Sequence, residues 1–163
     1  MHPTRIDEID AILVNGPYGA FQLASAALFR KERGTFHRVS LSQGWGIESP
    51  FGLDSPAGKA LLEKLRGGGA ARIPLPPRSD DDAATDITAP ALAVPAMIAD
   101  ELYAIAMYGP HLTGADLDRL EVKSLENFVG NVAVGYETAR MTLAEREVQI
   151  LRQKLATSSG PTP

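Results

Sequence analysis

The last third of the chain predicts a single helix that is longer than a domain of this size needs. Asp118 is followed three residues later by Glu121, which is the spacing of a helix capping box. A helix from about residue 118 to about residue 155 would span roughly 57 Å. The 163 residues of the chain are enough for one domain. The second half of this helix must therefore find a partner outside its own domain core.

The apolar pattern of this helix changes near Arg140. Before that residue, one face is predicted to lie against the domain through Leu125, Phe128, Val129, Val132 and Tyr136, and Leu143 continues this face. After it, the spacing alternates between three and four residues, as in a coiled-coil seam formed by Met141, Ala144, Val148, Leu151 and Leu155. The sequence therefore predicts a homodimer through these five residues. The alternative is a bent helix whose second half folds back onto its own domain.

The charges beside this seam favour a parallel dimer. If Met141 occupies the first core position of a heptad, Arg140 faces Glu145 of the partner subunit. In the same way, Glu147 faces Arg152 of the partner subunit, and both pairs are attractive. Exposed ion pairs contribute only about 0.2 to 1 kcal/mol each. They would therefore select register and direction more than they supply stability.

The first part of the chain alternates between helical and strand patterns. Residues 4–13 have the apolar spacing of a helix, which residues 15–17 (Asn-Gly-Pro) are expected to end. A β-hairpin follows, with its turn at residues 33 and 34 (Arg-Gly). A glycine-rich loop then leads to a short helix, with Ser55 as its cap and Pro56 at its first position.

Two apolar runs near the middle of the chain predict a second hairpin. Residues 91–99 and 102–109 flank Asp100 and Glu101, which we expect to form a two-residue turn. The runs are almost unbroken, which is typical of central strands covered on both faces. Pro95 lies inside the first run and predicts a bulge or a sheet edge there. Together with a short strand near residues 71–76, these patterns predict an α+β fold with a central antiparallel sheet.

Two segments, together with the order of the elements, resemble a GAF domain. Residues 91–133 (ALAVPAMIADELYAIAMYGPHLTGADLDRLEVKSLENFVGNVA) are similar to the apolar strand, tight turn, second apolar strand and last helix of that family. Residues 23–40 (LASAALFRKERGTFHRVS) resemble its first hairpin. The resemblance covers residues from about 5 to 140. PAS domains are the nearest related architecture, but the long last helix and the position of Pro95 favour the GAF family.

The resemblance implies a central antiparallel sheet, helices on one face that pair with those of a second subunit, and a ligand cavity on the other face. It divides the chain into a GAF-like domain (residues 1–140) and a coiled-coil extension (residues 141–156), and composition predicts a disordered tail (residues 157–163). It also implies small-molecule sensing, or signalling to an output protein such as a kinase, cyclase, phosphatase or transcription factor. The chain would be either a stand-alone regulator or a fragment of a larger sensor.

The segment after the first hairpin supplies the candidate cavity residues. In GAF-like folds this segment covers the open face of the sheet. We therefore expect Trp45, Phe51 and Leu53 to line a cavity there, together with Ile73 and His37. The alternative is that these side chains simply fill the core.

The lack of cysteine excludes several chemistries. Disulfides, thiolate nucleophiles and Cys-ligated metals are excluded, as are covalent bilin attachment and the reaction of GAF-type free methionine sulfoxide reductases. The Asn, Lys, Phe, Asp and Glu motif of cyclic-nucleotide-binding GAF domains cannot be placed on this sequence. His37 and His111 are the candidate haem ligands, but a histidine near a strand end is more often a hydrogen-bonded structural residue. The acidic run at residues 80–82 is typical of a solvated loop rather than a cation site.

Charge and hydropathy narrow the functional classes. The net charge of −4 opposes binding to nucleic acid. The longest apolar tract, residues 89–107, is broken by prolines and acidic residues and cannot span a membrane. We therefore expect a cytoplasmic sensory or regulatory domain that is not an enzyme. The alternatives are a structural dimerisation module with a filled core and, less favoured, a small enzyme that uses His37 or His111 with an acidic partner.

Overall fold

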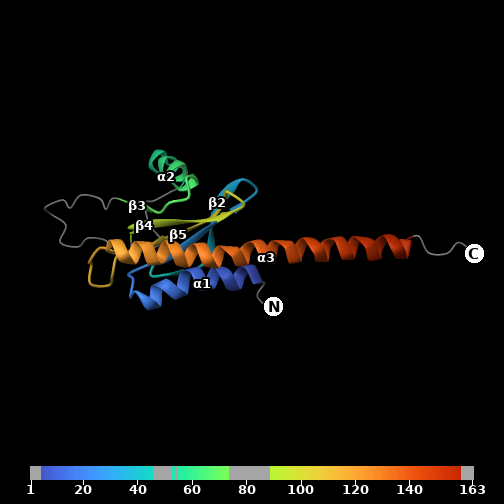
Figure 1. Cartoon of the computed structure of the whole chain (residues 1–163), viewed down its shortest axis with the longest axis horizontal. Helices are drawn as coiled ribbons and strands as arrows, with labels where there is room; N and C mark the ends of the chain where they lie inside the picture. Colours follow the sequence, from blue (N-terminus) through green and yellow to red (C-terminus); the bar gives the residue numbers. More distant parts are fainter. Residues whose placement is uncertain (1–4, 46–52, 54, 74–88, 159–163) are drawn as a thin grey trace, which may run out of the picture.

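The computed structural model describes residues 5–45, 53, 55–73 and 89–158. In this part of the chain, helices cover both faces of a five-stranded antiparallel sheet (Figure 1). Helices α1 (Arg5–Ala20) and α3 (Arg119–Ser158) lie on one face, and α2 (Pro56–Arg66) lies on the other. The strands are β1 (Ala26–Glu32), β2 (Thr35–Gln43), β3 (Ala71–Arg72), β4 (Leu92–Ile98) and β5 (Glu101–Tyr108), in the order β2-β1-β5-β4-β3. The predicted α+β class with a central antiparallel sheet is confirmed.

Two tight hairpins build the centre of this sheet. Arg33 and Gly34 form the turn between β1 and β2, with φ angles of 51° and 83°. The turn between β4 and β5 consists of Ala99 and Asp100, with φ angles of 49° and 63°, and Glu101 already pairs with Ile98. Positive φ at both central residues is what a type I′ turn requires. The sequence placed this second turn one residue too late, because neither residue is the glycine or asparagine that usually marks it.

Pro95 lies in β4, opposite Ile105 of β5. On the other side of β4, strand β3 pairs only with Leu92 and Ala93, so it ends before it reaches Pro95. The register of β4 against β5 shifts between Ala96 and Met97, one residue after the proline. Pro95 has no N–H to donate, and the sheet accommodates it because β3 does not extend that far and a bulge follows it. The sequence predicts this bulge or edge position.

The core has two parts, one on each face of the sheet. Between the sheet and helices α1 and α3 lies a cluster that includes Leu13, Leu125 and Val129, all with 0% exposure. Each fully buried side chain of this kind stabilises the fold by about 1.5 to 3 kcal/mol. Between the sheet and α2 lies a second cluster that includes Leu65 and Ile105. Burial on both faces explains why the sequences of β4 and β5 are apolar almost throughout.

Helix α1 continues through Pro17, although the sequence predicted its end at residues 15–17. A proline inside a helix cannot donate a hydrogen bond to the carbonyl four residues earlier, here that of Leu13. In the structure, the hydroxyl of Tyr108 donates to the Leu13 carbonyl oxygen at 2.7 Å. Tyr108 is fully buried and comes from β5, so a residue distant in sequence satisfies the orphaned carbonyl. The prediction of the helix end was wrong because it relied on local sequence alone.

We expect Tyr108→Phe to lower the free energy of unfolding by about 1 to 2 kcal/mol, because it leaves the buried Leu13 carbonyl without a donor. Urea denaturation followed by circular dichroism measures this loss. The matched background is Pro17→Ala, which restores a backbone N–H four residues after Leu13. In that background Tyr108→Phe should cost clearly less. An equal cost in both backgrounds would show that the tyrosine does not compensate for the proline.

Helix α3 begins with the predicted capping box. The backbone N–H of Glu121 donates to the Asp118 carboxylate at 2.8 Å, and the N–H of Asp118 donates to the Glu121 carboxylate at 2.9 Å. The last buried residue of α3 is Ala139, and residues 140–157 are all exposed. Leu143 is 43% exposed, so the prediction that it packs against the domain was wrong. The helix has already passed the edge of the sheet at this point (Figure 1).

Helices α1 and α3 run in opposite directions and approach each other closely. A Cβ atom at Gly135 would lie only 3.1 Å from Cδ1 of Ile9, and a Cβ at Gly16 would lie 3.3 Å from the ring of Phe128. Each helix thus contributes one glycine at a point of close contact, Gly16 on α1 and Gly135 on α3. This close approach brings the polar side chains of α1 within reach of α3.

Candidate functional site

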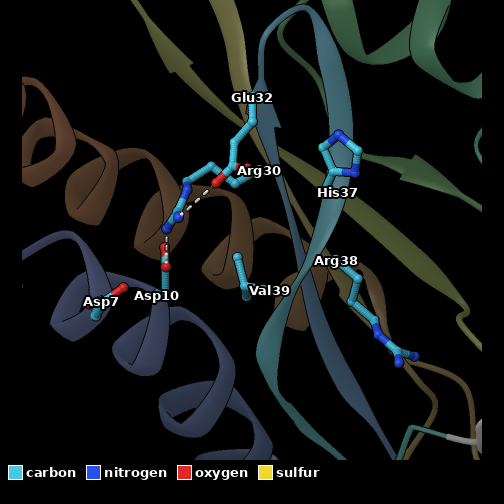
Figure 2. A pocket seen from close by; sticks show the side chains of 7 residues that line it. All are labelled: Asp7, Asp10, Arg30, Glu32, His37, Arg38 and Val39. Atoms are coloured by element: carbon cyan, nitrogen blue, oxygen red, sulfur yellow. Dashed lines mark hydrogen bonds and ion pairs between the residues drawn. The ribbon is translucent and has the colours of Figure 1, made fainter. Parts of the chain in front are cut away.

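A buried polar network joins three elements near the middle of α3, just before that helix leaves the sheet. Asp10 of α1, 3% exposed, accepts hydrogen bonds from the hydroxyl of Tyr136 on α3 and from the guanidinium of Arg30 on β1. The Arg30 side chain is 17% exposed and also contacts the exposed carboxylate of Glu32 at 3.3 Å. The two contacts of Asp10 thus tie the first helix to the sheet and to the last helix, and Figure 2 shows the contact with Arg30.

Two aromatic contacts extend this network towards the exposed half of α3. The ring of Tyr103, on β5, meets the ring of Tyr136 edge to face, with centroids 4.9 Å apart. The guanidinium of Arg140 lies over the Tyr103 ring, 5.3 Å from its centroid. A cation held over an aromatic face contributes about 0.5 to 1 kcal/mol at a partly exposed site. Arg140 is therefore held against its own domain at the position where α3 leaves it.

Burial dominates the electrostatics of Asp10. Desolvation raises the pKa of its carboxyl group, and the hydrogen bond from Tyr136 and the charge of Arg30 act in the opposite direction. Desolvation, followed by the hydrogen bond to Asp10, likewise raises the pKa of the Tyr136 hydroxyl, which remains a donor at neutral pH. The charge of Asp10 is balanced by Arg30, and Tyr136 adds a neutral donor, so the network is a structural link between the three elements.

A half-open cavity of about 300 Å³ lies beside this network, between α1 and the hairpin of β1 and β2 (Figure 2). Arg38 extends away from the Asp10–Arg30 pair, and His37 lies on β2 with its ring turned from it. The cavity is polar and mixed in charge, because its lining comprises Asp7, Asp10, Arg30, Glu32, His37, Arg38 and Val39.

The predicted cavity residues divide between the two faces of the sheet. Trp45, Leu53 and Ile73 belong to the cluster under α2, where Trp45 meets Phe29 edge to face at 6.1 Å. His37 lines the cavity on the α1 side, so the structure does not bring it together with the other three. Alternation along β2 places Phe36 under α2 and His37 on the opposite face. The remaining candidate, Phe51, lies outside the described residues.

The predicted seam residues lie on the exposed half of α3. Met141, Val148, Leu151 and Leu155 are 59%, 46%, 58% and 67% exposed, and Ala144 is exposed as well. Val134, seven residues before Met141, is 62% exposed and extends the row of first core positions back onto the domain. The alternative of a helix folded back on its own domain does not match the structure, because α3 continues straight past the sheet (Figure 1).

His111 is a structural residue at the start of α3. Its Nδ1 donates to the carbonyl oxygen of Phe21 at 2.8 Å, and its Nε2 donates to the carboxylate of Glu121 at 2.8 Å. Two acceptors call for two N–H donors, which only the protonated imidazole supplies. The Glu121 hydrogen bond, with support from that to Phe21, raises the pKa of His111. A histidine and a carboxylate are thus within reach of each other, but both ring nitrogens are engaged, and neither can ligate haem or accept a proton.

This contact predicts a pH dependence of stability. Because the folded-state pKa of His111 lies above the unfolded value of 6.5, its contribution is complete below that value and is lost as the pH rises through the folded-state pKa. We expect a decline of about 1 kcal/mol or less between weakly acidic and weakly alkaline pH, measured by urea denaturation. The decline should disappear in His111→Gln. His37→Gln, which removes an exposed imidazole, is the control and should retain it.

The described part of the chain contains neither a metal-binding cluster nor a membrane-spanning helix. There, no three His, Asp or Glu side chains are grouped so that they could hold a metal ion. None of the described helices is long and apolar enough to cross a bilayer. The acidic run at residues 80–82 lies outside the described residues.

The sequence did not identify the network of Asp10, Arg30 and Tyr136. One signal was present, since Asp10 interrupts the apolar positions of its helix between Ile9 and Leu13. Its partners come from β1 and from a position 126 residues further along the chain. A local pattern shows that such a residue needs a partner, but it does not name one.

Comparison with known proteins shows which folds this chain is similar to. No family model matches the chain, and no curated protein matches its sequence. Among solved structures, the GAF domain/HD domain protein from Geobacter sulfurreducens superposes with a TM-score of 0.65, at 16% identity, over 85% of this chain and 95% of that chain. The GAF domain of a phosphoenolpyruvate-protein phosphotransferase from Coxiella burnetii gives 0.59 at 16% identity, over 88% of each chain. The blue-light absorbing form of the PixJ GAF domain from Thermosynechococcus elongatus gives 0.60 at 13% identity, over 94% of this chain and 98% of that chain. These similarities confirm the predicted fold.

Proposed function

We propose that this chain, which has a GAF-like fold, is a non-catalytic sensory or regulatory module that acts as a parallel homodimer in the cytoplasm. The observation that carries the proposal is the exit segment, residues 140–157 of α3, which has left its own domain with an apolar seam exposed. The seam comprises Met141, Ala144, Val148, Leu151 and Leu155, and a second copy of the chain is its proposed occupant.

The length of the exit segment supports a partner. Eighteen helical residues extend about 27 Å. Single helices of this length are only marginally stable in water, because most helical stability in proteins comes from packing an apolar face. The row of Val134, Met141, Val148 and Leu155, spaced by seven, crosses the point where the helix leaves the domain. A parallel copy would bury this row from the domain surface to the end of the helix.

Charge complementarity supports a second copy as the occupant. In a parallel pair, Glu147 faces Arg152 of the partner subunit. The other predicted pair, from Arg140 to Glu145 of the partner subunit, competes with the position of Arg140 over Tyr103. One attractive pair per side therefore remains without any rearrangement, and it sets the register more than the affinity.

The buried network suggests how a change in the domain would reach the exit segment. Asp10 and Tyr136 join α1 to α3, and Arg30 joins both to the sheet. Tyr136 lies one turn of helix before Arg140, so a displacement of β1 would act on the last buried turn of α3. Small shifts or rotations of helices at a dimer interface are a common way to transmit such a change.

The structural neighbours give the proposal its functional class. One is a GAF domain in a protein that also has an HD domain, and another is a GAF domain of a phosphotransferase. By analogy of fold, we propose that this chain regulates an output protein.

A structural dimerisation module without a ligand is the second candidate. One observation favours it: Trp45 and Leu53, which were expected to line a cavity, instead pack with Phe29 and other members of the cluster under α2. The cavity beside Asp10 does not include these residues. Native mass spectrometry of the chain purified from its own host separates the two candidates, because only a sensor would retain a small molecule.

Sedimentation equilibrium of the whole chain tests the shared part of both candidates. We expect the mass of a dimer at micromolar concentrations, and a monomer throughout that range would overturn the proposal.

A further inference from the structure

A second cavity, of about 250 Å³, lies where α3 leaves the domain, and its charge is opposite in sign to that of the chain. Its lining includes Lys31 at the end of β1, Arg33 in the turn after it, and Arg140 on α3. Glu101 is the one carboxylate among the described residues that line it. The lining therefore carries a formal charge of about +2, whereas the whole chain carries −4.

The three cations of this cavity are available to a ligand. Among the described residues, none of them has an ion-pair partner, and Glu101 is not close enough to any of them to form a salt bridge. Arg140 is held in place by the Tyr103 ring beneath it. A cation that is fixed before binding loses less side-chain entropy when an anion arrives.

Tyr103 adds a hydrogen-bond donor. Its side chain is half-buried and lines the same cavity, and its hydroxyl has no hydrogen-bond partner among the described residues. Desolvation raises the pKa of this hydroxyl, so that it is a donor at neutral pH. The cavity lining thus includes two arginines, one lysine and one phenolic O–H donor, which are the residue types that hold a phosphoryl dianion in proteins.

We propose that this cavity binds a small molecule that carries a phosphate monoester, with Arg33, Arg140 and Tyr103 contacting the phosphoryl oxygens and Lys31 adding positive charge from the neighbouring strand. The charge matches, since a phosphate monoester carries about −1.5 to −2 at neutral pH. The volume lies just below the range of about 300 to 1,000 Å³ found for drug-sized ligands, which limits the rest of the molecule to a few carbon atoms. The bound anion joins the turn between β1 and β2 to Arg140, the first residue of the exit segment. The site is separate from the seam, so it does not depend on the proposed dimer.

Titration of the whole chain with glycerol 3-phosphate at constant ionic strength tests the site, with calorimetry and backbone amide NMR shifts as readouts. We expect saturable binding with shifts centred on Arg33, Gly34 and Arg140. Removing one charge-assisted contact, in Arg33→Ala or Arg140→Ala, should weaken binding about tenfold. Lys123→Ala is the matched control, because it removes an exposed cation of α3 outside the cavity, and it should leave the affinity unchanged. Circular dichroism verifies that each variant folds.

Parallel titrations with inorganic phosphate and with glycerol identify which part of glycerol 3-phosphate the cavity recognises. Binding of inorganic phosphate at the same residues supports the site and shows that free phosphate can also occupy it, whereas binding of glycerol alone would overturn it. The proposal is also overturned if glycerol 3-phosphate produces no saturable response, or if Lys123→Ala weakens binding as much as Arg33→Ala, because the attraction would then be one of overall charge.

Discussion

Asp10→Asn is expected to lower the free energy of unfolding by about 3 kcal/mol. The substitution keeps the shape of the side chain and creates no cavity, so its effect is electrostatic. Among the described residues, it leaves the guanidinium of Arg30, 17% exposed, with only the exposed Glu32 as a carboxylate partner. Removing one member of a buried ion pair typically costs about 3 to 5 kcal/mol, and the partial exposure of Arg30 places this case at the lower end. Urea denaturation measures the loss as a lower midpoint at an unchanged slope.

Two variants make this expectation specific. Glu8→Gln removes an exposed carboxylate from the same helix and should change the stability by less than about 0.5 kcal/mol. Adding Arg30→Met to Asp10→Asn removes the orphaned cation and should recover part of the loss, because a buried ion pair can often be replaced by apolar groups at little cost. If Asp10→Asn were no more destabilising than Glu8→Gln, the network would not hold α1, β1 and α3 together.

Local signals in the sequence were enough to predict the long helix and the hairpins. The capping box of Asp118 and Glu121 lies within one turn, and the heptad spacing after Arg140 repeats along a single helix. Both depend on residues at most seven positions apart, so no knowledge of the fold was needed. The same is true of the cap at Ser55, whose hydroxyl accepts from the N–H of Gly58 at 3.0 Å.

Contacts between distant residues account for what the sequence did not show. Pro17 failed to end α1 because Tyr108, 95 residues from Leu13, supplies the missing hydrogen bond. The sequence could not separate His37 from Trp45, because alternation along a strand distinguishes two faces without saying which one a helix will cover. The cations of the second cavity lie on β1, its turn and α3, and only the folded chain brings them together.

We expect Met141→Glu combined with Val148→Glu to raise the dissociation constant of the proposed dimer at least about a hundredfold, which is about 2.8 kcal/mol. Both residues occupy first core positions of the seam and are 59% and 46% exposed in the single chain. In the dimer, each glutamate would have to be buried without a partner or would force the helices apart. Glutamate forms helices well, so α3 itself should persist. Sedimentation equilibrium measures the dissociation constant, and circular dichroism verifies the helix content.

The same helix offers a matched control with equal charge and spacing and with similar exposure. Leu143 and Ile150 are also seven residues apart and are 43% and 50% exposed, but they lie two positions after the core positions and away from the seam. Leu143→Glu combined with Ile150→Glu adds the same charge and removes a comparable apolar area, yet should leave the dimer intact. If both double variants dissociated alike, the association would depend on general apolar exposure or net charge rather than on a defined seam. The exit segment could not then transmit a rotation or a shift, because such a signal requires two helices held in one register.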